Sequence, residues 1–245
     1  MIITRLWEKN YDRLTTSIIE SLPIEPTWRC LDVGAGGGSM SYWLAERVPQ
    51  GSVIALDTDV RLLDAGRAPN LTVEQADITT KGPDEPGSLD FILIRAVLSL
   101  VPDPDELIAR AVSWLAPGGW LLAEDFYFMP GADCPTANGR TVVGAYVQAF
   151  DAGGANPWVG RRLPAALARA GLTSVNKHVR PLGPGQGDSE NALMRARMEL
   201  QGQPLIDNGL LTADDIAQFI ESLERPESQD VTTLLFSAWG QRPRT

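Results

Sequence analysis

The sequence predicts an α/β fold: a doubly wound, mostly parallel sheet covered by helices on both faces. Short apolar runs alternate with helical patterns after a turn that is marked by Pro23 and Pro26. A strand that is buried on both faces of a sheet appears in the sequence as such a continuous apolar run. Because right-handed crossovers join consecutive parallel strands, this alternation favours three layers with the sheet in the middle.

Each strand is expected where an apolar run ends at a turn signal. The expected strands span residues 29–33, 53–56, 71–75, 89–94, 120–124, 173–180 and 231–239. The expected helices span residues 5–21, 39–48, 60–68, 104–114, 141–150, 163–170 and 191–200. Asp103 is a candidate N-cap for one of these helices, and Thr212 with Asp215 resembles a capping box that opens a further helix.

The regular alternation lapses in two stretches, residues 126–160 and 181–230, which are rich in Gly and Pro and contain separate helical patterns. Ligands of open α/β sheets bind at the carboxyl ends of the strands. These two stretches follow strands at that end, so we expect them to form a helical cap over a binding site. A chain of 245 residues suits one domain with such insertions.

The composition argues against several function classes. The formal net charge is −10, and an acidic surface repels phosphate backbones, which disfavours a nucleic-acid partner. The two cysteines, Cys30 and Cys134, suggest neither a disulfide scaffold nor a metal site, and Cys30 is expected in the core. No apolar run reaches membrane-spanning length and no signal-peptide pattern is present, so we expect a cytoplasmic protein without a membrane partner.

A glycine-rich turn follows the first predicted strand. Gly34, Gly36 and Gly38 alternate there, and glycine permits positive φ and a close approach of the backbone to a ligand. A dinucleotide-binding turn would place a third glycine at position 39, where this chain has Ser39. Asp32, at the end of the same strand, would repel a pyrophosphate but can attract a cationic ammonium or sulfonium group.

Polar residues also stand at the ends of the next three strands. Asp57 ends the second strand, where an acidic side chain can bind two ribose hydroxyls. Asp77 could accept a hydrogen bond from an adenine amino group, and the Ile78 amide could donate to a ring nitrogen. Arg95 ends the fourth strand, beside the position of the ligand's amino-acid portion. Each of these residues alone is equally typical of a helix cap, a loop or a surface ion pair.

Together these features resemble the class I S-adenosylmethionine-dependent methyltransferases. The match rests on the glycine turn, on Asp57, on Asp77-Ile78 and on the run from Arg95 to Asp103, followed by a Pro-Gly-Gly turn at residues 117–119. It covers residues 28–125. The resemblance implies a seven-stranded sheet with the order 3-2-1-4-5-7-6 and an antiparallel seventh strand.

The resemblance also implies S-adenosylmethionine as the cofactor and no metal. Residues 28–125 would form the cofactor-binding core of a single domain spanning residues 1–245. Residues 1–27 would form a helical lid, in which Trp7 and Tyr11 either cover the cofactor or pack in the core. The expected cofactor-binding residues are Tyr11, Asp32, Gly34, Ala35, Gly36, Asp57, Thr58, Ala76, Asp77, Ile78 and Arg95.

Methyl transfer from a sulfonium is an in-line displacement whose leaving group is a neutral thioether. Positioning can therefore supply most of the catalysis, up to ~7–11 kcal/mol, and a base is needed only when the nucleophile carries a proton. Glu124 and Asp125 close the fifth strand and are candidate bases, or else carboxylates that cap a loop. Tyr146, Phe150 and Trp158 could shape an apolar acceptor pocket or belong to the core.

The expected activity is methyl transfer to O, N or C of a small organic molecule. The segments at residues 160–164 and 234–240 are similar to small-molecule methyltransferases of bacterial secondary metabolism. Two alternatives remain: a protein of this fold that binds S-adenosylmethionine without transferring methyl, for example a cyclase, and a nicotinamide-dependent oxidoreductase. Asp32, Ser39 and the lack of a Tyr-x-x-x-Lys pair disfavour the oxidoreductase. The cap helices could also form a homodimer contact. The only histidine, His178, is expected at the surface.

Overall fold

One sheet of seven strands organises the part of the chain that the computed structural model describes, residues 2–83 and 85–244. Its strands are β1 (Arg29–Val33), β2 (Ser52–Asp57), β3 (Leu71–Gln75), β4 (Leu89–Arg95), β5 (Leu115–Phe128), β6 (Thr173–Leu182) and β7 (Thr233–Gln241). The order across the sheet is β3-β2-β1-β4-β5-β7-β6. Only β7 runs antiparallel to its neighbours in this described sheet. The predicted fold class, sheet order and antiparallel seventh strand are confirmed.

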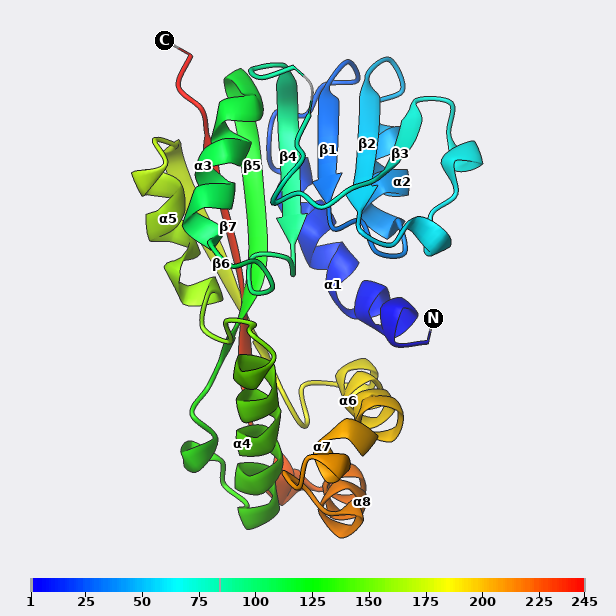
Figure 1. Ribbon diagram of the computed structural model, residues 1–245, viewed down its shortest axis with the longest axis vertical. Helices are drawn as coiled ribbons and strands as arrows, with labels where there is room; N and C mark the ends of the chain where they lie inside the picture. The colour runs from blue at the N-terminus through cyan, green and yellow to red at the C-terminus, as the bar shows by residue number, and fades with distance from the viewer. Residues whose placement is uncertain (1, 84, 245) are drawn as a thin grey trace.

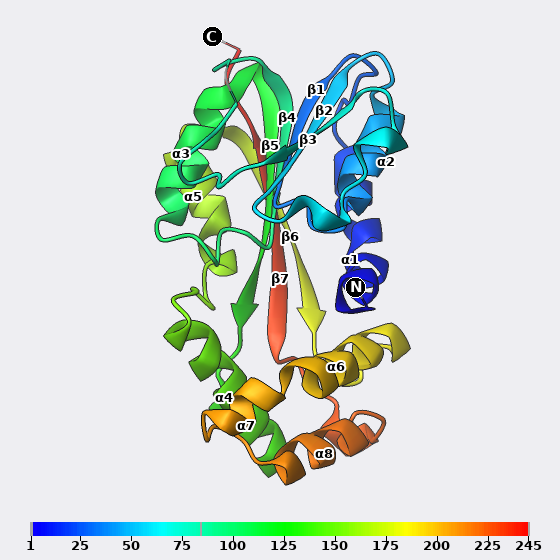
Figure 2. The same ribbon diagram turned by 45° about the vertical axis from the view of Figure 1, so that its right-hand side comes forward.

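Helices cover both faces of the sheet. The described α-helices are α1 (Ile2–Glu20), α2 (Ser39–Arg47), α3 (Pro104–Trp114), α4 (Ala137–Ala152), α5 (Leu163–Arg169), α6 (Asp188–Gln201), α7 (Gln203–Asp207) and α8 (Ala213–Ser222). In Figures 1 and 2, α3 and α5 lie on one face of the sheet and α1 and α2 on the other. Leu107 and Leu167 pack with Ile92 on the first face, while Ile19 and Leu44 pack on the second.

The remaining helices form a second lobe beyond the carboxyl ends of β1, β2 and β4 (Figure 1). There α4, α6, α7 and α8 surround the ends of the long strands β5, β6 and β7 (Figure 2). An apolar cluster that includes Val142, Leu205, Phe219 and Leu223 holds this lobe together. The helical insertions expected after strands five and six are therefore present, and α1 contacts them through α6. No helix within the described ranges is both long and apolar enough to cross a membrane.

The predicted helix at residues 60–68 is wrong. The structure has two short 3₁₀ turns there, η1 (Val60–Leu62) and η2 (Ala65–Arg67), and neither turn buries a residue. The side chain of Asp59 accepts a hydrogen bond from the Arg61 amide, and Asp64 accepts one from the Gly66 amide. Such local bonds compete with helix formation. A segment without a buried apolar face also gains too little from packing to become a helix.

Both predicted helix caps are confirmed. Asp103 accepts a hydrogen bond from the Glu106 amide at the start of α3. At the start of α8, the Thr212 hydroxyl accepts a bond from the Asp215 amide, and the Asp215 carboxylate accepts one from the Thr212 amide. The short helix α7 was not predicted, because five residues are too few to show a helical apolar period. Cys30 is buried in the core, as expected.

We expect Thr212→Ala to lower the free energy of unfolding by about 1 kcal/mol, because it removes the side-chain half of the capping box. Denaturant unfolding followed by circular dichroism measures this change. Gln218→Ala, which removes only an exposed bond to Asp214 on the same helix, is the matched control. Its effect should stay below about 0.5 kcal/mol. Equal effects of the two substitutions would show that the capping box does not stabilise α8.

Candidate functional site

A cleft of about 430 Å³ opens at the carboxyl ends of β1 to β4. Six residues predicted from the sequence to bind the cofactor line this cleft: Gly34, Asp57, Thr58, Ala76, Asp77 and Ile78. They come from the ends of three successive strands, whose parallel pairing brings them to one edge of the sheet. The structure therefore brings together the centre of the predicted site. The cleft also lies in the size range of small-molecule sites.

The glycine turn fixes the orientation of Asp57. The Gly36 amide donates to Oδ2 of Asp57 at 2.8 Å, and the Asp59 amide donates to Oδ1 at 3.0 Å. Gly34 and Gly36 have φ values of 72° and 57°, which favour glycine. The Thr58 hydroxyl also donates to Oδ1, over a long 3.4 Å. A carboxylate has about four acceptor positions, so Asp57 can accept hydrogen bonds from both hydroxyls of a diol once the Thr58 hydroxyl turns away. Ala35 belongs to the same turn and donates its amide to the Leu56 carbonyl.

Gly34 also has a steric role in the cleft. A Cβ atom at this position would lie 2.2 Å from Cγ2 of Val97, and both residues line the cleft. Only a residue without a side chain keeps the turn after β1 this close to the loop after β4. The turn therefore exposes its backbone to the cleft at this position. A ligand that extends across the end of the strand can then approach the backbone closely.

Asp77 is exposed at the far end of the cleft. Its Oδ1 accepts bonds from the Thr79 hydroxyl at 2.7 Å and the Thr79 amide at 2.8 Å. These two bonds lower the pKa of Asp77, the hydroxyl contributing most. Oδ2 takes part in neither bond. Ile78, the next residue, is buried at 5% exposure and forms an apolar wall of the cleft beside this carboxylate.

Asp32 and Arg95 are not among the residues that line the cleft. Oδ2 of Asp32 accepts a bond of 2.6 Å from the Ser41 hydroxyl, and burial raises the pKa of this carboxyl. The Arg95 guanidinium forms an ion pair of 2.8 Å with Asp12 and lies 4.7 Å above the Trp7 ring. Because Asp12 and Trp7 both lie on α1, Arg95 attaches that helix to the strand end.

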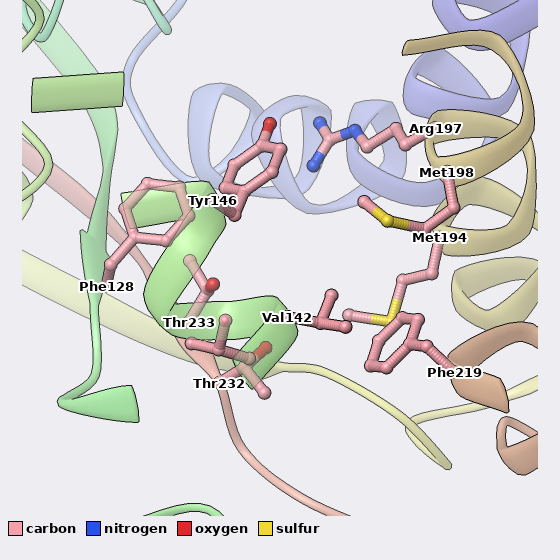
Figure 3. A pocket seen from close by; sticks show the side chains of 10 residues that line it. Phe128, Val142, Tyr146, Met194, Arg197, Met198, Phe219, Thr232 and Thr233 are labelled. Atoms are coloured by element: carbon pink, nitrogen blue, oxygen red, sulfur yellow. The ribbon is translucent and has the colours of Figure 1, made fainter. Parts of the chain in front are cut away.

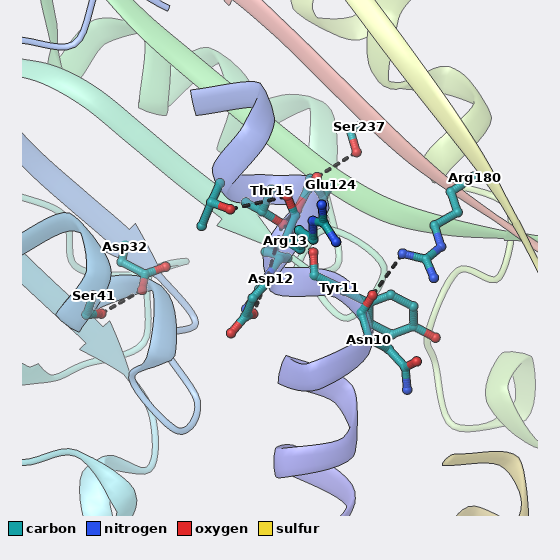
Figure 4. A network of polar contacts seen from close by, with 12 residues as sticks. Asn10, Tyr11, Asp12, Arg13, Thr15, Asp32, Ser41, Glu124, Arg180 and Ser237 are labelled. Atoms are coloured by element: carbon teal, nitrogen blue, oxygen red, sulfur yellow. Dashed lines mark hydrogen bonds and ion pairs between the residues drawn. The ribbon is translucent and has the colours of Figure 1, made fainter. Parts of the chain in front are cut away.

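The two candidate bases are both fully buried, at 0% exposure. Glu124 accepts bonds of 2.6 Å from the hydroxyls of Thr15 and Ser237 (Figure 4), and Asp125 accepts a bond of 2.9 Å from the Ser99 amide. Burial raises the pKa of Glu124 and raises that of Asp125 to about 6. A general base must reach the proton that it removes. Neither carboxylate lines the cleft, and strand β5 continues past both of them to Phe128, so they do not close the strand as expected. Asp125 caps the loop after β4, whereas Glu124 joins α1 to β7.

A second cavity, of about 200 Å³, adjoins the cleft on the side of the helical lobe. Ala96 and Leu100 line both spaces, so the two meet at the loop after β4. Ala96 has a φ of 55°, a conformation that is rare for residues other than glycine and that concentrates at functional sites. Leu100 is 60% exposed, so an apolar side chain lies open where the two spaces meet.

Aromatic residues dominate the second cavity. Trp7, Phe126 and Phe128 line it together with Tyr146 and Phe150. The last two residues were predicted to shape an acceptor pocket. The third predicted residue was Trp158, which is not part of this lining and is 44% exposed.

Tyr11 lines the aromatic cavity instead of the predicted cofactor cleft. Its hydroxyl donates to Oε2 of Glu190 at 3.0 Å, and its ring packs edge-on against Trp7. Burial raises the pKa of Tyr11 well above its usual range, and the Glu190 charge raises it further. Tyr11 therefore joins α1 to α6 at the wall of the cavity, and it is also part of a buried apolar cluster.

A third space, of about 60 Å³, lies deeper in the helical lobe and shares Phe128, Tyr146 and Met194 with the aromatic cavity (Figure 3). The sequence did not indicate Glu190 or Arg197, the two charged residues of α6 that line the aromatic cavity. They belong to no motif. The one signal in the sequence is that the helix carrying them follows a Gly- and Pro-rich stretch that was expected to form part of the cap.

Over the described ranges, no group of His, Cys, Asp or Glu side chains is arranged to hold a metal ion. His178 is exposed on β6, as expected. The groups that the cleft presents to a ligand are carboxylates, backbone amides and apolar side chains.

Comparison with known proteins gives a family for this architecture. The profile of a family described as "Methyltransferase domain" matches residues 3–177. A trans-aconitate 2-methyltransferase from Methylobacterium radiotolerans is 33% identical over 120 residues, which are 48% of this chain and 45% of that protein. The chain spans about half the length of the curated relatives it matches.

Two solved structures share the fold. One is a phosphoethanolamine N-methyltransferase from Haemonchus contortus in complex with S-adenosylhomocysteine; it has a TM-score of 0.64 and 14% identity, and the match covers 95% of this chain and 53% of that chain. The other is a cyclase with a TM-score of 0.63 and 16% identity, where the match covers 98% and 84% of the two chains.

The family match includes β1 to β5 with the glycine turn and all the strand ends that line the cleft. It favours the methyltransferase interpretation over a nicotinamide-dependent oxidoreductase. The resemblance to the class I S-adenosylmethionine-dependent methyltransferases is confirmed, and the chain belongs to the methyltransferase domain family.

Proposed function

We propose that this chain transfers a methyl group from S-adenosylmethionine to an oxygen, nitrogen or carbon atom of a small organic molecule, a bacterial secondary metabolite. The observation that carries the proposal is the junction of two spaces at Ala96 and Leu100. One space is a cleft with carboxylates at successive strand ends, and the other is an aromatic cavity. A cofactor in the first and an acceptor in the second would meet at this junction.

The cleft fits an adenosyl group. Asp57, held in place by Gly36 and Asp59, would accept hydrogen bonds from the two ribose hydroxyls, with Thr58 beside it. Asp77 would accept a bond from the adenine amino group through its Oδ2. The apolar wall at Ala76 and Ile78 would contact the adenine ring. The turn formed by Gly34, Ala35 and Gly36 would pass close to the amino-acid portion of the cofactor.

Asp32 and Arg95 would support the site from behind. Asp32 connects β1 to α2 through Ser41, so it holds the far end of the glycine turn. Arg95 binds Asp12 and also donates to the Thr15 hydroxyl at 3.2 Å, and this holds α1 over the carboxyl ends of the strands. We assign both residues positioning roles in cofactor binding, and the same applies to Tyr11 on the acceptor side.

Bound S-adenosylmethionine supplies an electrophilic methyl group on a positively charged sulfur. The leaving thioether is neutral, so the protein need not provide an acid. What the chain must do is align the acceptor atom with the methyl group and exclude water, which positioning and an aromatic enclosure achieve. Asp125 contributes by holding the Ser99 amide, in the loop that also carries Ala96 and Leu100.

A second candidate function follows from the burial of Glu124 and Asp125. Since neither candidate base reaches the cavity, the site could bind S-adenosylmethionine and an organic substrate without methylating it. A cyclase shares the fold, which shows that such a sheet can carry a different reaction. The two candidates differ in whether the product gains a methyl group.

We expect Asp57→Ala to weaken binding of S-adenosylhomocysteine by roughly 1–3 kcal/mol, because two ribose hydroxyls lose their acceptor. Isothermal titration calorimetry of the purified chain measures this loss. Asp64→Ala is the matched control, since Asp64 also caps a short turn after β2 but does not line the cleft. An Asp57→Ala protein that folds and binds with unchanged affinity would contradict the assignment of the ribose site.

Methyl transfer itself is tested by mass spectrometry with isotopically labelled S-adenosylmethionine and a panel of small aromatic acceptors. The proposal predicts a product that carries the labelled methyl group, formed in equal amount with S-adenosylhomocysteine. A product without the label, formed while the cofactor remains intact, would favour the non-methylating candidate.

The buried carboxyl of Asp125 predicts a pH dependence of stability. Its pKa is raised from 3.8 to about 6 by burial, so the folded protein retains this proton to a higher pH than the unfolded chain. The resulting stability is complete below about pH 3.8 and is lost as the pH rises through about 6. The free energy of unfolding, measured relative to Asp125→Asn, should therefore fall over this range and then level off.

Denaturant unfolding of both proteins at several pH values between these limits measures the difference. Asp151→Asn, at an exposed carboxyl, reports how much any such substitution contributes. A difference that rises with pH would show that the Asp125 carboxylate is stabilised in the folded protein, against the expected direction.

A further inference from the structure

Arg197 on α6 lines both the aromatic cavity and the deeper space behind it. Figure 3 shows its guanidinium extending from α6 toward Tyr146. The side chain is partly buried. It forms no hydrogen bond or ion pair with any residue in the described ranges. A guanidinium has five donors, so this one is available to a ligand.

The other arginines of this region have partners. Arg195, on the same helix, lies 3.7 Å from Glu224. Arg225 lies 3.7 Å from Glu221, and Arg180 donates to the Asn10 carbonyl at 2.8 Å. Arg197 differs from these arginines because no described carboxylate lies within ion-pair distance of it, and Glu190 acts on it only as a charge at longer range. A guanidinium that is partly withdrawn from water without a direct partner lowers the stability of a protein. Its position in the cavity leaves its donors open to a ligand.

The charges around the cavity favour an anion over a cation. Glu190 is the only acidic residue among those that line the aromatic cavity, and its carboxylate already accepts bonds from the Tyr11 hydroxyl. Burial raises the pKa of Glu190, while the Tyr11 bond and the charges of Arg197 and Arg180 oppose that rise. Two guanidinium groups thus surround one carboxylate, in a chain whose formal net charge is −10.

The position of Arg197 also separates the place where an acceptor would be anchored from the place where it would receive the methyl group. Ala96 and Leu100 mark the junction with the cofactor cleft, and they line the aromatic cavity but not the deeper space. Arg197 lines both. An anionic group bound to this guanidinium would therefore lie toward the helical lobe, and the rest of the molecule would extend past Phe128 and Tyr146 toward the junction.

We propose that the acceptor is an aromatic or otherwise apolar molecule bearing a carboxylate, and that Arg197 selects it by binding that carboxylate. The proposal rests on the proposed methyl transfer and specifies its substrate class. The carboxylate is the anchor, and the atom that receives the methyl group lies at the other end of the molecule. The planar guanidinium suits this role because it binds a carboxylate through two parallel hydrogen bonds.

The test compares three probes with one aromatic body and different head groups: 2-naphthoate, 2-naphthamide and 2-naphthylmethylamine. Their affinities for the full chain saturated with S-adenosylhomocysteine are measured by isothermal titration calorimetry. We expect 2-naphthoate to bind about tenfold or more tightly than the neutral amide, because a charge-assisted bond replaces a neutral one. The amine should bind more weakly than the amide.

Three variants then locate the effect. Arg197→Gln should remove the preference for the carboxylate, while Arg195→Gln, two residues away on α6 at a side chain that lines neither space, should keep it. Arg197→Lys should restore part of the preference, since it returns the charge without the bidentate geometry. Circular dichroism confirms that each variant is folded.

Equal binding of the three probes, binding of none, or a preference for the amine would overturn the proposal, as would a carboxylate preference that survives Arg197→Gln. These outcomes are separable from a failure of the proposed methyl transfer. If S-adenosylhomocysteine binds but the carboxylate is not preferred, only the substrate class is wrong. If S-adenosylhomocysteine does not bind at all, the proposed function fails, and the probe titration without it still reports on Arg197.

Discussion

The hydrogen bond from the Gly36 amide to the Asp57 carboxylate, 2.8 Å long, is the contact on which the rest of the site depends. It connects the turn after β1 to the end of β2. The glycine turn and Asp57, which are 21 residues apart in the sequence, therefore form one surface. The parallel pairing of β1, β2 and β3 then places Asp77 and Ile78 at the same edge. The Gly34 and Ala35 amides, which donate to the Leu56 carbonyl, hold the same turn to the same strand end.

Behind that surface, a buried polar network ties the helical lid to the sheet. Arg95, at the end of β4, binds Asp12 and Thr15 of α1, and Thr15 in turn donates to Glu124 on β5. Charged groups removed from water must be paired to remain tolerable, and each member here has a partner. The network explains why Glu124, a candidate base in the sequence, is enclosed in the structure. Together with Arg95 it positions α1, which forms one wall of the acceptor cavity through Trp7 and Tyr11.

The sheet and the cofactor cleft were predictable because both follow from local patterns. Buried parallel strands are short apolar runs, and strand ends carry the glycines and acids that a nucleoside ligand needs. Residues 60–68 have a periodicity that resembles a helix, but Asp59 and Asp64 cap two shorter turns there. The burial of Glu124 and Asp125 depends on Ser99, Thr15 and Ser237, which are distant in sequence. The acceptor cavity was only partly predictable: Tyr146 and Phe150 were identified, but Arg197 and Glu190 lie on a helix whose partners no motif reveals.

The central claim is that carboxylates at successive strand ends and a glycine turn bind an adenosyl group beside an aromatic cavity. The most direct measurement is a crystal structure of the chain with S-adenosylhomocysteine. The account predicts that both ribose hydroxyls lie within hydrogen-bond distance of Asp57 and that the sulfur points to the junction formed by Ala96 and Leu100. Density for the ligand elsewhere, or a ribose that makes no contact with Asp57, would contradict it.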